Sequence, residues 1–284
     1  MTAKISISKD EFNLLRGYIQ EQCGILVGDE KLYLIENNLS QLVVESGCAS
    51  FRDFYFKAKN DRRSGLRDKI VDAMTNNETL WFRDGVPWAV FEEAILPVMA
   101  DWLRTKKKPR IRLWSCACST GQEPYSVAMV IDRFCKSYQG KGVDKFQFEI
   151  VGTDISPTVL FKAISGRYDS LAVSRGLTPE IKQKYFTEDG QSWILNEDIR
   201  RMVTFKQFNL QDNFISLGKF NLVFCRNVAI YFSTEFKKQL FAKIANTLKP
   251  DGFFMVGSSE SLRGYSEDFV SKDHKRGIYY QVKP

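Results

Sequence analysis

The sequence lacks several features that mark common classes of protein. It has a single histidine, His274, and six cysteines without a CxxC pair, so no set of zinc ligands can be assembled and no metal site is expected. No apolar run approaches the ~18–20 residues that a membrane-spanning helix needs. The first residues, MTAKISISKD, lack the apolar core of a signal peptide. We therefore expect a cytoplasmic protein with reduced thiols that does not insert into a membrane.

The charge is unevenly placed along the chain. The formal net charge of +7 admits nucleic acid, an acidic membrane face or an acidic protein as a partner. Residues 1–75 hold 11 Lys/Arg and 11 Asp/Glu, yet their basic side chains concentrate in RRSGLRDK, at Arg62, Arg63, Arg67 and Lys69. Such a cluster is either a solvated helix face or a surface for an acidic partner, and the sequence leaves both open. No stretch interleaves aromatic residues with Lys/Arg as single-strand nucleic-acid binders do.

The first 75 residues have the pattern of short amphipathic helices. Ser8 and Glu11 have capping-box spacing and open a helix that runs to Gly24. Further helices are predicted over 31–46, from Ser50 onward, and over 66–74. We expect a helical amino-terminal domain over 1–75, and then a linker with a long helix over 76–110. That helix should cover 84–103, with a bend near Pro97.

From residue 111 to 284 the pattern alternates between strands and helices. This alternation predicts an α/β domain built on a doubly wound, mostly parallel sheet. Strands are expected over 111–116, 146–153, 220–225 and 252–258, with a last strand at GIYYQV, and helices over 123–137, 157–164 and 234–248. An insert at 167–207 interrupts the rhythm. Its helix should cover Pro179–Tyr185, and its segments QSWILN and RRMVTFKQF should form a small β-hairpin.

The ends of the predicted strands suggest a ligand site. The first strand runs into SCACSTG at 115–121, a loop of small residues that would let a ligand lie against backbone amides at a helix start. Asp154 follows the second strand and could accept from both hydroxyls of a ribose. The GxGxxG fingerprint and the P-loop lysine are absent, so a nucleoside without a pyrophosphate, such as S-adenosylmethionine, suits the loop best. A tight turn that binds no ligand is the alternative.

A second polar group precedes the sheet, in TNNETLWFRD at 75–84. Asn77 and Thr79 would also suit a plain boundary loop. Arg83, which follows Trp81 and Phe82, suits better a residue that holds a carboxylate by a bidentate contact. The methionine end of S-adenosylmethionine carries such a carboxylate.

Five segments in order resemble one known family. NNETLWFRD, WSCACSTGQEPYSVAM, GTDIS, FCRNVAIYFS and GSSESL are similar to the successive motifs of the CheR-type chemotaxis receptor (protein-glutamate) O-methyltransferases. The resemblance implies a class I S-adenosylmethionine-dependent methyltransferase fold behind a small helical domain. It also implies methyl transfer to glutamates of bacterial chemoreceptors during signal adaptation, with S-adenosylhomocysteine as the product. The implied partner is the receptor's cytoplasmic helical bundle, with no nucleic acid, and a monomer is expected.

The resemblance also implies roles for individual residues. Glu123 would meet the methionine end of the cofactor, Asp154 the ribose, and Asn209 with Leu210 the adenine. Tyr231 would stand near the transferred methyl group as the catalytic residue, and the basic cluster Arg62, Arg63, Arg67 and Lys69 would face the receptor. The full set of implied cofactor contacts is Asn77, Thr79, Arg83, Glu123, Asp154, Asn209, Leu210, Asn227 and Val228.

The chain departs from the family pattern at a few positions. Gln122, Ser233 and Ser258 stand where the family usually has Glu, Asp and His. These departures keep open a non-catalytic module that senses S-adenosylmethionine, and the basic pI keeps open a nucleic-acid methyltransferase. The hairpin expected in the insert is short, which argues against docking of a receptor's carboxyl-terminal pentapeptide.

Overall fold

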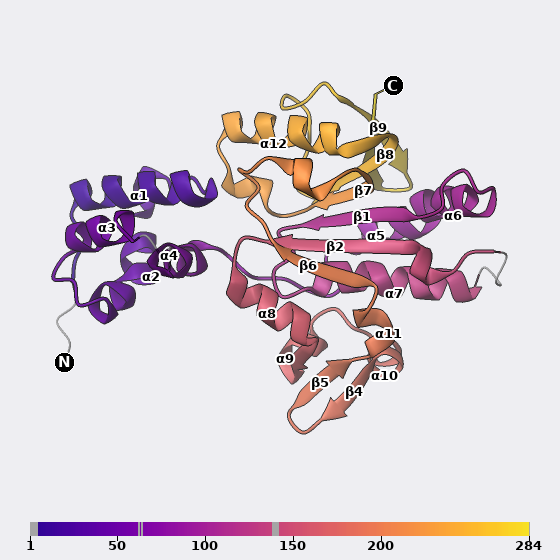
Figure 1. Ribbon diagram of the computed structural model, residues 1–284, viewed down its shortest axis with the longest axis horizontal. Helices are drawn as coiled ribbons and strands as arrows, with labels where there is room; N and C mark the ends of the chain where they lie inside the picture. Colours follow the sequence, from indigo (N-terminus) through magenta and orange to yellow (C-terminus); the bar gives the residue numbers. More distant parts are fainter. Residues whose placement is uncertain (1–4, 62, 64, 138–141, 284) are drawn as a thin grey trace.

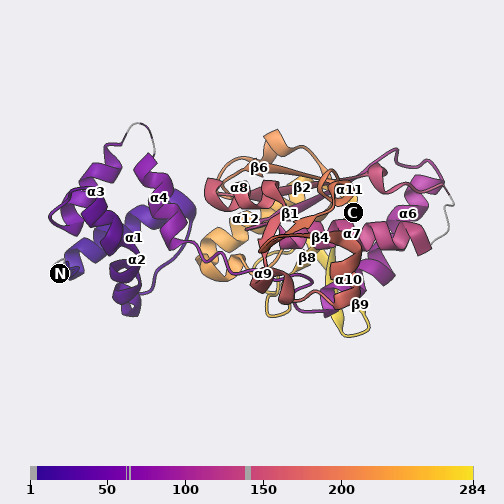
Figure 2. The ribbon, with the colours of Figure 1, turned by 90° about the horizontal axis from the view of Figure 1, so that it is seen from below.

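The amino-terminal part of the chain is a bundle of four helices. The computed structural model describes residues 5–61, 63, 65–137 and 142–283. The bundle consists of α1 (Lys9–Cys23), α2 (Leu32–Glu45), α3 (Phe51–Lys59) and α4 (Gly65–Met74), with a 3₁₀ turn at Asp29–Lys31. The predicted capping box is present, since the Ser8 side chain accepts from the Glu11 amide and the Glu11 carboxylate accepts from the Ser8 amide. Phe12, Ile35 and Phe54 lie in its own buried core, and Figure 2 shows the bundle beside the rest of the molecule.

A long helix follows the linker, as predicted, in three parts. These are α5 (Val86–Val90), a π-helical turn η2 (Phe91–Ile95) and α6 (Leu96–Arg104). Pro97 cannot donate an amide hydrogen to the preceding turn, so the wide turn falls directly before it. Trp88, Phe91 and Leu96 are buried against the sheet.

The carboxyl-terminal part is a seven-stranded sheet with helices on both faces, which confirms the predicted fold class. The strands are β1 (Ile111–Cys116), β2 (Phe148–Asp154), β6 (Val203–Gln207), β7 (Phe220–Cys225), β8 (Leu248–Val256), β9 (Phe269–His274) and β10 (Gly277–Val282). Their order is β6-β2-β1-β7-β8-β10-β9. The first five are parallel, and β10 runs antiparallel to both of its neighbours.

The two faces of the sheet have separate apolar cores. On one face α5, α6 and α7 (Gln122–Ser137) cover residues such as Leu113 and Phe224. On the other face α12 (Thr234–Thr247) and the 3₁₀ turn η4 (Phe214–Leu217) cover Trp114 and Phe254. The helix α8 (Pro157–Ser165) follows β2 and lies beside the edge strand β6 (Figure 1). Within the described ranges, no helix is both long and apolar enough to cross a membrane.

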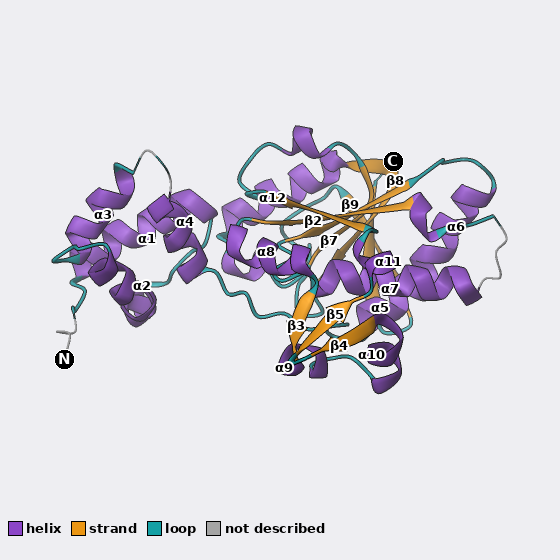
Figure 3. Cartoon of the chain, turned by 60° about the horizontal axis from the view of Figure 1, so that its bottom comes forward, coloured by secondary structure: helices purple, strands orange, loops and turns teal. Residues whose placement is uncertain are grey.

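The insert differs from the prediction. RRMVTFKQF does not pair with QSWILN; its residues Val203–Gln207 form β6, which pairs in parallel with β2 at the edge of the main sheet. QSWILN instead supplies β5 (Ser192–Leu195), the middle strand between β3 (Arg167–Asp169) and β4 (Phe186–Asp189). Figure 3 shows this small sheet projecting from the main one. The argument against a receptor pentapeptide rested on the expected hairpin and loses its support.

Short helices complete the insert and the remaining connections. The helix α10 (Pro179–Tyr185) is present where it was predicted. Around it lie α9 (Ser170–Ser174), α11 (Glu197–Arg200) and the 3₁₀ turns η3 (Lys145–Gln147) and η5 (Ala229–Tyr231). All six cysteines lie in the described ranges and carry free thiols, as predicted.

Candidate active site

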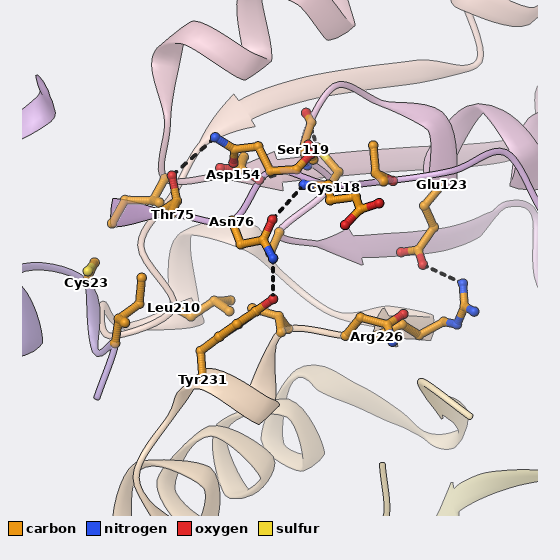
Figure 4. A pocket seen from close by; sticks show the side chains of 18 of the residues that line it. Cys23, Thr75, Asn76, Cys118, Ser119, Glu123, Asp154, Leu210, Arg226 and Tyr231 are labelled. Carbon is orange, nitrogen blue, oxygen red and sulfur yellow. Dashed lines mark hydrogen bonds and ion pairs between the residues drawn. The ribbon is translucent and has the colours of Figure 1, made fainter. Parts of the chain in front are cut away.

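A single pocket gathers the residues that the sequence analysis selected. It lies at the carboxyl ends of β1, β2 and β7, where the linker between α4 and α5 passes. Figure 4 shows side chains converging on it from the linker, the strand ends and η5. All ten residues implied as cofactor or methyl contacts line it: Asn77, Thr79, Arg83, Glu123, Asp154, Asn209, Leu210, Asn227, Val228 and Tyr231. Segments from Asn77 to Tyr231 therefore meet here, because parallel strands end at one edge of a sheet and the linker passes that edge.

The loop of small residues after β1 has an unusual backbone. Ala117, Ser119 and Gly121 have φ angles of 49°, 50° and 91°, in the region that disfavours large side chains. A Cβ on Gly121 would lie 3.0 Å from Ala163 Cβ, 3.2 Å from the Tyr125 ring and 3.3 Å from the Phe205 ring. Small side chains are therefore needed in this loop for two reasons: the backbone has positive φ angles, and the loop packs closely against α8 and β6.

Asp154 is held at the end of β2 by backbone amides. Its Oδ2 accepts from the Ser119 amide at 2.8 Å and its Oδ1 accepts from the Ser156 amide at 3.0 Å. The side chain is buried, and this burial raises the pKa of Asp154, while the backbone hydrogen bonds act in the opposite direction. The Ile155 amide also bonds this carboxylate, and three amides still leave one of its roughly four acceptor positions, so Asp154 can still accept from a ligand.

Glu123 is oriented by a buried arginine that the sequence analysis did not select. Arg226 Nη1 donates to Glu123 Oε2 at 2.9 Å, and Ser115 Oγ donates to Glu123 Oε1 at 2.7 Å. Arg226 Nη2 donates to Asp84 Oδ2 at 3.0 Å and to the Arg83 carbonyl at 2.8 Å. The Arg226 side chain is only 1% exposed. The position of Arg226 directly after β7, in FCRN, is the sequence signal that could have selected it. Its role could not be predicted, because it depends on two carboxylates that are remote in the sequence.

Arg83 and Glu123 give the pocket charges of both signs. Arg83 is half-buried, lines the pocket, and is held by a long hydrogen bond from Nη1 to the Glu78 carbonyl, at 3.4 Å. Because Glu123 lines the same pocket, a cation and an anion are available together. This combination fits the carboxylate and ammonium of an amino-acid moiety, and Asp154 fits a ribose. The residues present therefore fit S-adenosylmethionine.

The amino-terminal domain contributes to the opposite end of the pocket. Cys23 and Ile25, which follow or end α1, are part of the lining. Asn209 Nδ2 donates to the Gln22 carbonyl at 2.8 Å, so the polar residue after β6 is tied to α1. Lys243 of α12 donates to the carbonyls of Leu210, Gln211 and Asp212 and fixes the loop from the other side. The sequence analysis missed Cys23, Ile25 and Lys243, because only the tertiary structure brings them to this loop.

Asn227 adopts a left-handed conformation, with φ of 57°. Its amide donates to Glu260 Oε2 at 2.5 Å, and the Gly257 amide donates to the same oxygen at 2.8 Å. Burial raises the pKa of Glu260, whereas these amides and the nearby Arg226 oppose that effect. Glu260, from the motif GSSESL, thus fixes the turn that presents Asn227 and Val228 to the pocket.

Comparison with known proteins decides the family. The description "CheR methyltransferase, SAM binding domain" matches residues 77–278, and "CheR methyltransferase, all-alpha domain" matches residues 10–75. The chain belongs to the CheR methyltransferase family. It is 43% identical to the chemotaxis protein methyltransferase Cher2 of Pseudomonas putida, over 96% of this chain and 98% of that protein. It is 41% identical to chemotaxis protein methyltransferase 1 of Pseudomonas aeruginosa, over 98% of this chain and 100% of that protein.

Membership of the CheR methyltransferase family confirms several predictions from the sequence. This CheR methyltransferase is an S-adenosylmethionine-dependent enzyme, and S-adenosylmethionine is its cofactor. It carries the class I methyltransferase sheet behind an all-α amino-terminal domain.

Two of the three departures from the family pattern have structural roles in this CheR methyltransferase. Ser233 caps α12, since its side chain accepts from the Phe236 amide at 3.2 Å. A serine and an aspartate are about equally good at such a cap. Gln122 is buried at the start of α7 and accepts from Thr120 Oγ1 at 2.7 Å, and Ser258 is exposed in the turn that follows β8 and Gly257.

The basic cluster lies on and before α4. Arg63 and Lys69 are exposed, and Arg67 is half-buried and forms an ion pair with the adjacent Asp68 at 2.9 Å. Arg62 lies outside the described residues. The Asp72 carboxylate of the same helix accepts from Thr158 Oγ1 at 2.6 Å, so α4 also contacts α8 of the catalytic part. The end of α4 therefore contacts the sheet domain, whereas the cluster lies before this helix and in its first half.

Proposed function

We propose that this CheR methyltransferase transfers the methyl group of S-adenosylmethionine to glutamate side chains of bacterial chemoreceptors, forming glutamyl methyl esters. The observation that carries the proposal is the alignment of Arg83, Glu123 and Asp154 around one pocket at the strand ends. The relatives named above are chemotaxis protein methyltransferases, which supports the same choice of substrate. The enzyme would work in the cytoplasm as a monomer.

Each part of the cofactor has a proposed contact. Arg83 holds the methionine carboxylate and Glu123 the ammonium, with Glu123 itself oriented by Arg226 and Ser115. Asp154 accepts from the ribose hydroxyls, and Asn209 and Leu210 contact the adenine. Asn77, Thr79, Asn227 and Val228 complete the lining, and Tyr231 stands beside the methyl group.

The reaction needs alignment more than acid–base catalysis. When bound, S-adenosylmethionine supplies an activated methyl group on a positively charged sulfur. A glutamate with a pKa near 4.3 is already ionised at neutral pH, so its carboxylate can attack the methyl carbon directly. One C–O bond forms, the C–S bond breaks with its electron pair going to sulfur, and no proton moves. The pocket then acts by orienting the two partners, which can lower a barrier by about 7–11 kcal/mol when the alignment is good.

The basic cluster would receive the receptor. Chemoreceptor bundles that carry several glutamates are acidic, and Arg63, Arg67 and Lys69 offer the opposite charge on the amino-terminal domain, while Arg62 of the same cluster lies outside the described residues. Each methyl ester removes one negative charge from the receptor bundle and so reduces repulsion between neighbouring helices. The enzyme would thereby tune receptor signalling through electrostatics.

A transfer assay with tritiated S-adenosylmethionine tests the proposal. Receptor-containing membranes should gain label that alkali releases as methanol, because carboxylate esters are alkali-labile and methylated bases are not. RNA offered in the same assay should stay unlabelled. Calorimetry should show that the protein binds both S-adenosylmethionine and S-adenosylhomocysteine. Cofactor binding without transfer to any receptor offered would favour the cofactor-sensing module instead, and no binding at all would reject both.

A further inference from the structure

Tyr231 has a hydrogen-bond partner across the pocket that the sequence analysis did not single out. Asn76 follows α4 in the linker, and its Nδ2 lies 2.9 Å from the Tyr231 hydroxyl oxygen, which Figure 4 shows as a bond between two opposite walls. The two residues are 155 positions apart in the sequence. Asn76 is exposed to solvent, whereas Tyr231 is half-buried.

The orientation of the Asn76 amide is fixed by its other end. Asn76 Oδ1 accepts from the Glu78 backbone amide at 3.1 Å. A backbone N–H can only donate, so the side-chain atom that faces it has to be the oxygen. The nitrogen therefore faces Tyr231. Since an amide nitrogen only donates, the Tyr231 oxygen is the acceptor in this bond and the phenol keeps its own hydrogen for a different partner.

The backbone around Tyr231 is also held in place. The Tyr231 carbonyl accepts from the Leu26 amide at 2.9 Å, and Phe232 pairs with Ile25 in a β-bridge. The Tyr231 amide donates to the Val228 carbonyl at 3.2 Å. The backbone is thus held on both sides and the side chain packs against the apolar core of this face, and Asn76 acts on the hydroxyl group at its polar end.

We propose that Asn76 is a positioning residue that keeps the Tyr231 hydroxyl as a hydrogen-bond donor for the incoming acceptor carboxylate. The inference rests on the proposed function, in which Tyr231 stands beside the methyl group. By donating to one oxygen of the glutamate, the hydroxyl directs the other oxygen at the methyl carbon. An ionised carboxylate only accepts hydrogen bonds, so a hydroxyl that is forced to donate elsewhere could not bind it.

The variant N76D reverses the direction of the bond. Its new carboxylate still accepts from the Glu78 amide, so the local turn is kept, but it cannot donate to Tyr231 and takes the hydroxyl hydrogen instead. N76A removes the donor and leaves the hydroxyl free to rotate. We expect kcat for receptor methylation to fall about tenfold in N76D and about threefold in N76A, as for the loss of one hydrogen bond to a charged group. The Kd for S-adenosylhomocysteine should stay within about twofold of wild type.

N76D could also slow the reaction simply because its added negative charge repels the acidic acceptor. Combining N76D and N76A with Y231F distinguishes this effect from the proposed role. Without the hydroxyl, N76D and N76A should each change kcat by less than about twofold. Equal losses in both backgrounds would overturn the inference, because Asn76 would then act through charge or through the Glu78 turn. Wild-type kcat in N76D would overturn it as well. In either case an active wild-type enzyme would leave the proposed function standing, whereas a wild type without transfer would reject the proposed function itself.

Discussion

The Arg226 guanidinium lies against Glu123, with 2.9 Å between Nη1 and Oε2, although the two residues are 103 positions apart. Asp84 meets the same guanidinium from the opposite side at 3.0 Å. Within the described residues Arg226 Nε has no hydrogen-bond partner, so this cation is held through its two Nη atoms by the two carboxylates and the Arg83 carbonyl. A buried ion pair of this kind is costly to break from one side, because the remaining charge stays out of water.

The two carboxylates around Arg226 should have different effects when they are neutralised. Glu123→Gln removes a charge that lines the pocket, whereas Asp84→Asn removes a charge outside the lining. Both variants should lower the free energy of unfolding by about 1–3 kcal/mol. Only Glu123→Gln should also weaken S-adenosylmethionine binding, by about tenfold or more. Urea denaturation and calorimetry on the two variants check this, and an equal loss of cofactor affinity in Asp84→Asn would contradict it.

Gly121→Ala should damage the loop after β1. The position has a φ of 91°, and the added methyl group would meet Ala163, Tyr125 and Phe205 at 3.0–3.3 Å. We expect a loss of about 1–3 kcal/mol in the free energy of unfolding, with weaker cofactor binding. Gly190→Ala is the matched control. Its φ is 61°, but no described atom lies within 4 Å of the added carbon, so it should cost only about 1 kcal/mol and leave the cofactor Kd unchanged.

Asp154 should make stability depend on pH with a definite sign. Burial raises the pKa of Asp154 above 3.8 in the folded protein. As the pH rises from 3.8 through this raised pKa, the unfolded chain gives up the proton before the folded protein does. Ionisation of Asp154 therefore removes stability from the wild type over this window. Asp154→Asn cannot ionise, so its free energy of unfolding relative to wild type should increase with pH there.

Urea denaturation of both proteins at a series of pH values between about 3.8 and 7 gives this difference. A difference that decreases with pH would show that the hydrogen bonds from Ser119 and Ser156 outweigh burial. Calorimetry at neutral pH should show a large loss of S-adenosylmethionine affinity in the same variant. Asp154→Asn would then gain stability relative to wild type as the pH rises, although it binds S-adenosylmethionine more weakly. This is expected of a buried carboxylate that serves binding and not stability.

Removing basic charge near α4 should weaken receptor binding alone. The double variant Arg63→Ala/Lys69→Ala loses two exposed charges, one just before α4 and one on it. Since an exposed ion pair contributes about 0.2–1 kcal/mol, KM for receptor should rise roughly three- to tenfold, with cofactor Kd unchanged. The effect should shrink at high salt, where surface charges are screened.

The double variant Lys106→Ala/Arg110→Ala is the control for total charge. These exposed residues follow α6, at the end of the molecule away from the helical bundle (Figure 1). Their removal should leave KM for receptor near wild type. An equal rise in KM for both double variants would show that net charge, and not the cluster on α4, attracts the receptor.

Several parts of the fold could be predicted because their cause is local. The capping box at Ser8 and Glu11 and the serine cap of α3 need only a few neighbouring residues. The bare loop 115–121 was recognised from its run of small residues alone, and the structure adds a local reason for them, because Ala117, Ser119 and Gly121 have positive φ angles. Ten of the pocket residues were implied by the family resemblance, whose motifs lie in the linker or follow strands, whereas Cys23, Ile25 and Arg226 were not selected.

The insert shows where local patterns fail. VTFKQ has the composition of a strand in any context, but its partner is β2, about 50 residues earlier, and not the nearby QSWIL. The alternation of side chains along a strand is the same in a hairpin and at a sheet edge. Pairing is decided by long-range packing, here by Phe205 against Gly152 and Tyr125.

The sequence by itself determined the fold class, the order of the motifs and the chemistry that they offer, because these follow from periodicity and from residue type. Only the tertiary structure decided that Arg226 orients Glu123, that α1 closes one end of the pocket, and that Asn76 faces the Tyr231 hydroxyl. The physical reason is that the partners lie far apart along the chain, where no local sequence pattern can report their contact. These contacts join residues 103 to 187 positions apart, and a hydrogen bond acts only across about 3 Å.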